Sequence, residues 1–415
     1  MNKNELSHKI SSLSIGWACF LMLLSCSPWF MWNTAILNLF AILIFISTRF
    51  YLFFYKHNQQ GFFLYKTSVI WLFIFICWMC LRSGIISGYV TLPITRFLPL
   101  FFITCMSDKE KILLKERAIV MFSILLTFSI IWYCLFLLSI PLPNTITEDP
   151  AYGAFRNYYL FVVNTNVEHW SYFRFSSIFK EPGYVGMISA LFLYIERYNY
   201  KRWRAWVLTI ALFLSLSLAA YVLFFLGWII NFIAERKSLK IIIAAFLTAI
   251  VVFVVVDRAI EYDKGTGLLT HVILERLAYD EEKGIAGNNR NNYEFDEWYD
   301  NYKTEATYLV GISLAGYQKL FPIGNSSYKV FIAQYGIIGL LLLSILFLSY
   351  VFRNKNRLGL GMFILFAISF VQRPYILWEA QSFMFICAVV YFNNCSTTIC
   401  ERKTMTEDNR YNIKF

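Results

Sequence analysis

The stretch from Arg174 to Gly186 brings together residue types that could perform acid–base and anion chemistry. It reads Arg-Phe-Ser-Ser-Ile-Phe-Lys-Glu-Pro-Gly-Tyr-Val-Gly. Pro182 suits the first turn of a helix, because its missing N–H would be unpaired there in any case. Glu181 precedes it and would lie at the positive end of the helix dipole. Glu181 could therefore simply cap a membrane helix, or it could act as a general base where water meets the bilayer.

Arg174 lies in an aromatic segment, next to Phe173 and Phe175. One interpretation is an interfacial anchor, in which the guanidinium extends from an apolar segment toward lipid headgroups. The other is a clamp on a phosphate or pyrophosphate, which the planar fork of a guanidinium fits better than an ammonium does. Residue type alone leaves both interpretations open.

Arg290 is the strongest cation candidate further along the chain, within the run Gly287-Asn-Asn-Arg-Asn-Asn-Tyr293. It could bind an anionic substrate or be an ordinary solvated loop residue. The acidic residues around it are contiguous rather than spaced like metal ligands, which favours a solvated acidic face: Asp280, Glu281, Glu282, Glu294, Asp296 and Glu297. We therefore expect no metal site.

Two further arginines fall at the ends of apolar runs or inside them. Arg373, in Gln372-Arg-Pro-Tyr375, lies on the short turn before the last predicted span. Arg96 is flanked by Pro93 and Pro99, which predicts a broken helix opening on a cavity. An arginine within a membrane segment is a candidate functional residue by default, with a lipid phosphate as its expected partner.

Several motifs that would indicate other chemistry are missing from the sequence. It contains no Walker loop, GxGxxG, HExxH or GxSxG motif. We therefore expect no nucleotide, redox or metal cofactor. Any group transfer must then use a substrate that arrives in the membrane already activated.

The composition predicts an all-α polytopic membrane protein. Of 415 residues, 58% are hydrophobic and only 15% are charged, while the net charge of +11 comes mostly from Lys and Arg in short connections. This charge pattern indicates membrane orientation and anionic lipid contact rather than nucleic-acid binding. Apolar runs of about 20 residues predict about twelve spans, at 11–28, 33–54, 67–86, 89–106, 118–140, 183–197, 204–218, 219–234, 241–257, 332–351, 358–372 and 376–393.

The basic connections alternate along the chain, which predicts that both termini lie in the cytoplasm. Two long segments would then be external loops, and such loops usually carry function. Apolar-periodic pieces at Leu268–Leu277 and Tyr308–Leu320 predict helices within the second loop. The expected organisation is 1–140 for spans one to five, 141–182 for the first loop, 183–257 for spans six to nine, 258–331 for the second loop, 332–393 for spans ten to twelve and 394–415 for a cytoplasmic tail.

Three motifs make the chain resemble the O-antigen polymerases of the Wzy type, within the polymerase–ligase superfamily of membrane glycosyltransferases. The first is the Arg174–Gly183 segment, similar to the family's Arg…Phe-x-Glu-Pro signature ahead of a span. The second is a long external loop with a central Arg290, followed by Leu309-Val-Gly-Ile312. The third is Gly324-Asn-Ser-Ser-Tyr-Lys-Val-Phe-Ile-Ala-Gln-Tyr-Gly-Ile-Ile-Gly339. The predicted topology also matches, so the resemblance covers the whole chain and implies an architecture like that of the GT-C glycosyltransferases.

The resemblance implies a metal-independent polymerase in the bacterial inner membrane with its site facing the periplasm. It would join repeat units carried on undecaprenyl pyrophosphate and release undecaprenyl pyrophosphate. Glu181, Arg174 and Arg290 would be catalytic, with Arg174, Arg290, Arg373 and Arg96 around the pyrophosphate. Expected partners are lipid-linked glycans and membrane lipids, together with a chain-length regulator and a flippase of the same pathway.

Two other functions stay open at this point. The first is an O-antigen ligase that transfers glycan to lipid A core. Members of that family, however, carry a His near the span that follows the second loop, where this chain reads Gly324-Asn-Ser-Ser327. The second is a flippase for lipid-linked oligosaccharides. A flippase would be expected to line its central spans with charge, and here the candidates gather at one face.

Overall fold

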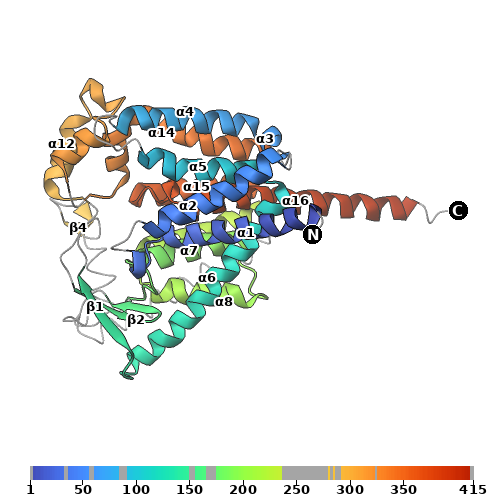
Figure 1. Ribbon diagram of the computed structural model, residues 1–415, viewed down its shortest axis with the longest axis horizontal. Coiled ribbons are helices and arrows are strands. Elements are labelled where there is room, and N and C mark those ends of the chain that lie inside the picture. Colours follow the sequence, from blue (N-terminus) through green and yellow to red (C-terminus); the bar gives the residue numbers. More distant parts are fainter. Residues whose placement is uncertain are drawn as a thin grey trace.

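The computed structural model is a bundle of helices with a small sheet and a small helical lobe at one end (Figure 1). It describes residues 3–31, 36–55, 60–83, 91–148, 155–164, 174–235, 279–280, 284–285, 291–322 and 325–411. The α-helices of the bundle are α1 (Lys3–Ser25), α2 (Ile36–Phe50), α3 (Gln60–Leu64), α4 (Lys66–Ser83), α5 (Thr91–Cys105), α6 (Asp108–Leu137), α7 (Pro182–Ile195), α8 (Trp203–Leu214), α9 (Leu218–Ala234), α14 (Tyr328–Asn354), α15 (Arg357–Gln372) and α16 (Glu379–Tyr411).

Among the described residues, five helices are long and apolar enough to cross a membrane by length and composition: 5–25, 36–54, 66–83, 108–137 and 328–354. Five further apolar helices among these residues are shorter, between 10 and 17 residues. A helix occupies each range in which a span was predicted, except 241–257, which lies outside the described residues. The class of all-α membrane protein therefore holds, while the count of twelve spans stays a prediction.

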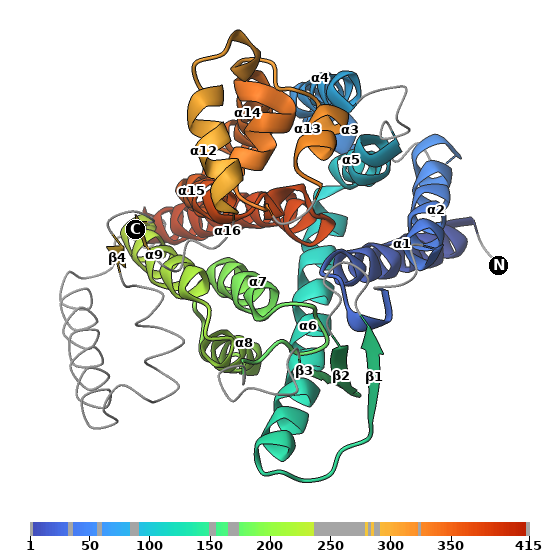
Figure 2. The same cartoon turned by 90° about the vertical axis from the view of Figure 1, so that its left-hand side faces the viewer.

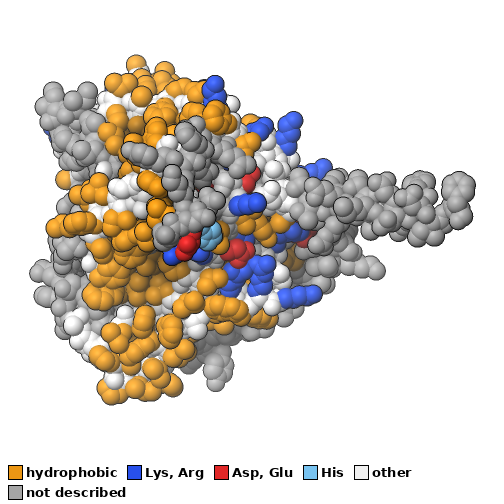
Figure 3. All heavy atoms as spheres, turned by 45° about the vertical axis from the view of Figure 1, so that its right-hand side comes forward, with side chains coloured by type: hydrophobic (Ala, Val, Ile, Leu, Met, Phe, Trp, Pro, Cys, Tyr) orange, Lys and Arg blue, Asp and Glu red, His pale blue; other side chains and the backbone are white. Residues whose placement is uncertain are grey.

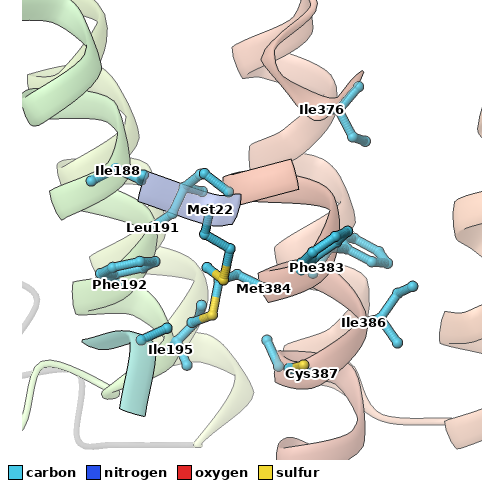
Figure 4. Packing of buried hydrophobic residues seen from close by; sticks show 14 of the residues in the cluster. Met22, Ile188, Leu191, Phe192, Ile195, Ile376, Phe383, Met384, Ile386 and Cys387 are labelled. Carbon is cyan, nitrogen blue, oxygen red and sulfur yellow. The ribbon is translucent and has the colours of Figure 1, made fainter. Parts of the chain in front are cut away.

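Helices α7 and α16 form the centre of the bundle. Every residue of α7 from Val185 to Ile195 is buried, and so is almost every residue of α16 from Glu379 to Val390. A helix that is apolar on all sides must be surrounded by other helices. Figure 4 shows Met22 of α1 between α7 and α16, close to Met384. Both central helices begin at the end of the bundle that carries the loops.

The two loops form small structures at that same end, away from the chain termini (Figures 1 and 2). The first loop contains an antiparallel sheet of β1 (Asn144–Glu148), β2 (Phe155–Tyr159) and β3 (Val162–Asn164), in which Ile146 pairs with Asn157. This sheet was not predicted.

The second loop contains a two-stranded ladder and a helical lobe. The ladder is formed by β4 (Tyr279–Asp280) and β5 (Gly284–Ile285), and the lobe by α12 (Tyr293–Tyr302) and α13 (Leu314–Leu320). The helix predicted at 308–320 is therefore shorter than expected, and the one predicted at 268–277 lies outside the described residues. The described residues also contain three short helical turns: η1 (Trp29–Met31), η6 (Ala306–Tyr308) and η7 (Tyr375–Leu377). A π-helical segment, η2 (Tyr51–Tyr55), extends α2.

The predicted break around Arg96 is wrong. Helix α5 runs without interruption from Thr91 to Cys105, with Pro99 inside it. Pro93 falls in the first turn, where its missing N–H costs nothing, and neighbouring helices stabilise a helix that contains an internal proline. The break occurs in α14 instead, where Gly336 adopts a non-helical conformation with φ of 71°.

A network of charged residues lies at the opposite end of the bundle, near both termini. Glu196, which is fully buried, receives hydrogen bonds from Arg202 at 3.0 Å and Arg204 at 3.1 Å, and Lys115 lies 3.8 Å away. Lys115 and Arg204 also bind Glu116, at 2.6 and 2.8 Å. Figure 3 shows charged side chains gathered on the part of this face nearest the C-terminal helix. The network joins the start of α6 to the end of α7 and the start of α8.

Candidate functional site

The structure brings Glu181 and Arg373 together. Nη1 of Arg373 lies 3.0 Å from Oε1 and 2.9 Å from Oε2 of Glu181, so one nitrogen bridges both carboxylate oxygens. The Glu181 side chain is 24% exposed, and the Arg373 side chain is 13% exposed. The two residues are 192 positions apart in the sequence, and each precedes one of the two central helices. The pair is therefore partly open to solvent at the point where α7 and α16 begin.

Glu181 occupies the N-cap position of α7 but does not cap the helix with its side chain. Its backbone is extended, with φ of −137° and ψ of 141°, and Pro182 follows as the first helical residue, as predicted. The carboxylate makes no capping hydrogen bond, and it is directed to Arg373 instead. The simple capping interpretation of Glu181 is therefore wrong for its side chain.

Two aromatic rings lie beside this pair. The guanidinium carbon of Arg373 is 6.0 Å from the centre of the Tyr184 ring, close enough for a cation–π contact. The ring of Trp378 meets that of Tyr184 edge to face at 4.8 Å. Both aromatic side chains are partly exposed. Carboxylate, guanidinium and aromatic faces are thus presented together, which is a combination able to bind an anionic, hydroxyl-rich ligand.

The segment leading to Glu181 is held in place from several sides. The N–H of Trp29 donates to the carbonyl of Ile178 at 2.9 Å, and the N–H of Val163 donates to that of Ser177 at 2.8 Å. The Ser177 hydroxyl also contacts Ser129 of α6 at 2.7 Å, and Phe179 is almost fully buried. These contacts fix the backbone before Glu181. The end of the first predicted loop is therefore a buried support and not an exposed segment.

Arg174 is placed by this same segment at the end of α8. Its Nε donates to the carbonyl of Ser215 at 3.1 Å, and the N–H of Phe175 donates to that of Leu214 at 3.0 Å. A cation there complements the negative end of the α8 dipole. Gly186 of α7 packs against this turn so closely that an added Cβ would meet Ser215 Oγ at 2.6 Å. Arg174 therefore lies near the first turns of α7.

Arg96 and Glu379 lie on the same side of the bundle. The Arg96 side chain is exposed, and its charge acts on both Glu379 and Tyr335. Glu379 is the first residue of α16 and is 8% exposed. Glu379 and Trp378 were not among the predicted site residues, although an acidic residue at the start of an apolar run is the same signal that identified Glu181.

The 309–312 segment of the second motif crosses the backbone of α14, which contains most of the third motif. Gly311, with φ of 83°, lies so close to α14 that an added Cβ would meet the carbonyl oxygen of Gln334 at 2.5 Å. The N–H of Ile312 donates to Ala333 at 2.8 Å, and that of Ile338 donates to Leu309 at 3.1 Å. The break in α14 is therefore filled by the 309–312 segment.

An arginine from α4 strengthens this crossing. Arg82 donates through Nη2 to the Gly311 carbonyl, and Trp78 donates through Nε1 to the Tyr335 carbonyl at 2.9 Å. Such partners are needed because buried backbone groups outside a regular helix must still be hydrogen-bonded. Arg82, near the end of the apolar helix α4, therefore has a partner within the protein.

The lobe above the crossing has an aromatic core. Phe295, Tyr299, Tyr302 and Tyr317 are buried against one another, and burial raises the pKa of Tyr302 to about 12. On its surface, Lys329 binds Asp296 at 2.7 Å, so this acidic residue is paired. Arg290 lies outside the described residues, and its role stays a prediction.

Comparison with known proteins does not identify the chain. No protein-family model, curated protein or solved structure matches it.

Proposed function

We propose that the protein is an O-antigen polymerase of the bacterial inner membrane. It would join oligosaccharide repeat units carried on undecaprenyl pyrophosphate and release undecaprenyl pyrophosphate. The observation that carries the proposal is the partly exposed pair of Glu181 and Arg373 at the start of both central helices. The resemblance of the sequence to that family supplies the reaction, and the paired groups supply chemistry that fits it.

In the proposed reaction, Glu181 accepts the proton of the acceptor hydroxyl. The acceptor oxygen attacks the anomeric carbon of the donor glycan, and the bond from that carbon to the pyrophosphate oxygen breaks. Arg373 lies beside the carboxylate and would neutralise the charge that develops on the leaving pyrophosphate. No nucleotide is required, because the pyrophosphate ester already activates the donor.

Two further features support an anionic leaving group at this place. The N-terminal ends of α7 and α16 both lie there, and helix N-termini favour bound phosphate groups. Arg174 and Arg96 add cationic groups on the same side of the bundle. Arg290 would contribute from the second loop, on the strength of the sequence alone. Tyr184 and Trp378 offer ring faces for sugars.

The proposed orientation places this end in the periplasm and both termini in the cytoplasm. The basic connections of the sequence support it. A cysteine-labelling experiment on intact cells checks it: a Cys introduced at exposed Tyr293 should react with a membrane-impermeant maleimide, and one introduced at exposed Lys355 should not.

A deletion strain tests the function directly through its lipopolysaccharide pattern on a gel. Loss of the long ladder with retention of a band carrying core plus one repeat unit is the expected result. Complete loss of O-units would contradict the polymerase and favour a ligase or a flippase. In the complemented strain, Glu181→Gln should abolish the ladder at normal protein level. The matched variant Glu294→Gln, an exposed glutamate of α12, should restore it fully.

A further inference from the structure

A polar cavity lies at the end of the bundle opposite the Glu181–Arg373 pair. Its volume is about 480 Å³, and it lies between the ends of α7 and α9, the turn from α14 to α15, and the middle of α16. The lining includes Arg197, Glu235, Lys355, Arg357 and Asn393. Four separate elements therefore contribute polar side chains to one space.

The charges around this cavity favour an anion. Arg197 binds Glu235 with Nε and Oε1 2.5 Å apart, so these two charges offset each other. Within the described part of the chain, Lys355 and Arg357 form no ion pair, in contrast to Lys115 and Arg204 nearby. Among the described residues, these two lining cations therefore have no counter-charge, and both are exposed.

The backbone contributes both signs of potential, because the C-terminal ends of α7, α9 and α14 and the N-terminal end of α15 all border the cavity. Lys355 adopts a left-handed conformation with φ of 47°, which turns the chain sharply between α14 and α15. Helix α15 then begins at Arg357, with the Asn356 side chain accepting a hydrogen bond from the N–H of Leu358 at 2.8 Å. The positive end of the 16-residue α15 therefore borders the cavity.

We propose that this cavity binds a phosphate group, carried either by an anionic phospholipid of the adjacent leaflet or by a small soluble anion. Basic pockets between the ends of membrane helices suit such headgroups. The site is separated from the proposed catalytic pair by the whole length of α7, about 21 Å for 14 residues. It does not depend on the proposed polymerase activity.

The test uses the purified full chain in a neutral detergent. Bound phosphatidylglycerol is measured by native mass spectrometry, with diacylglycerol as the control that lacks phosphate, and inorganic phosphate is titrated separately by calorimetry. The double variant Lys355→Gln/Arg357→Gln should weaken binding about fivefold for each cation removed. Arg353→Gln is the matched control, because Arg353 is also exposed and lies in the last turn of α14 but lines a different cavity.

A second variant keeps the test valid even if the double variant folds poorly. Glu235→Gln removes the one carboxylate among the described lining residues and releases Arg197, so it should tighten phosphate binding. Binding of phosphatidylglycerol alone identifies a lipid as the ligand, and binding of inorganic phosphate as well identifies a soluble anion. Equal binding of diacylglycerol, no binding of either phosphate ligand, or equal losses in Arg353→Gln would overturn the proposal.

Discussion

The two ends of α7 each carry a glutamate bound to arginine, but the two sites differ in accessibility. Glu196 at the far end is fully buried and is bound by Arg202, Arg204 and Lys115. Glu181 at the near end is 24% exposed and is bound by Arg373, itself beside two partly exposed aromatic rings. A carboxylate enclosed by cations from several elements stabilises the fold, whereas one at an open edge remains reachable by substrate.

The largest expected effect is a loss of stability at the far end of α7, where Glu196 is buried. Glu196→Gln leaves Lys115 and Arg204 without their buried counter-charge, and breaking a buried ion pair costs about 3–5 kcal/mol. Thermal unfolding of the purified protein should show a much lower midpoint, or the protein should fail to accumulate. An unchanged midpoint would mean that this network does not stabilise the bundle.

A smaller loss of stability is expected where the 309–312 segment crosses the break in α14. Gly336→Ala would force a Cβ against the Leu309 carbonyl at a positive φ of 71°, which we expect to cost about 1–3 kcal/mol. Proteolysis of the lobe should accelerate in this variant. Gly359→Ala in α15 is the matched control, because its new Cβ would meet Val389 at an ordinary 3.6 Å. Equal protease resistance of the two variants would show that the crossing does not stabilise the lobe.

Replacement of the guanidinium of Arg373 gives a third, more selective prediction. Arg373→Lys keeps the charge but replaces the planar guanidinium, whose Nη1 contacts both oxygens of Glu181, with a compact ammonium that lacks the other guanidinium donors. We expect polymerisation to fall about tenfold, equivalent to roughly 1.4 kcal/mol in the barrier, with little change in thermal stability. Full activity in the lysine variant would show that charge alone is sufficient.

The smallest expected effect is a change in stability caused by a substitution on the surface of the helical lobe. A hydrogen bond from Lys303 lowers the pKa of Asp300, and both side chains are well exposed. The stabilisation is present above the unfolded pKa of the carboxyl and is lost as pH falls through the folded pKa. Asp300→Asn should change stability by less than about 1 kcal/mol, as exposed ion pairs do. A larger change in the thermal midpoint would mean that the lobe surface is more tightly coupled to its aromatic core.

Much of the helical layout was predictable, because a long apolar run defines a membrane helix locally. Glu181, Arg373 and Pro182 were also recognised individually, since each lies at the edge of such a run. Their pairing was not, because it joins residues 192 positions apart and depends on how α7 and α16 pack. The break at Gly336 was missed for the same reason: it is created by the 309–312 segment that fills it.

The most direct test of the account compares Glu181→Gln with Glu196→Gln in purified protein supplied with repeat units on undecaprenyl pyrophosphate. Chain length on a gel gives the activity, and thermal unfolding gives the folded fraction. The account predicts that Glu181→Gln unfolds near the wild-type temperature yet polymerises at least about 100-fold more slowly, while the folded fraction of Glu196→Gln remains active. Wild-type chain length from Glu181→Gln, or inactivity in fully folded Glu196→Gln, would contradict it.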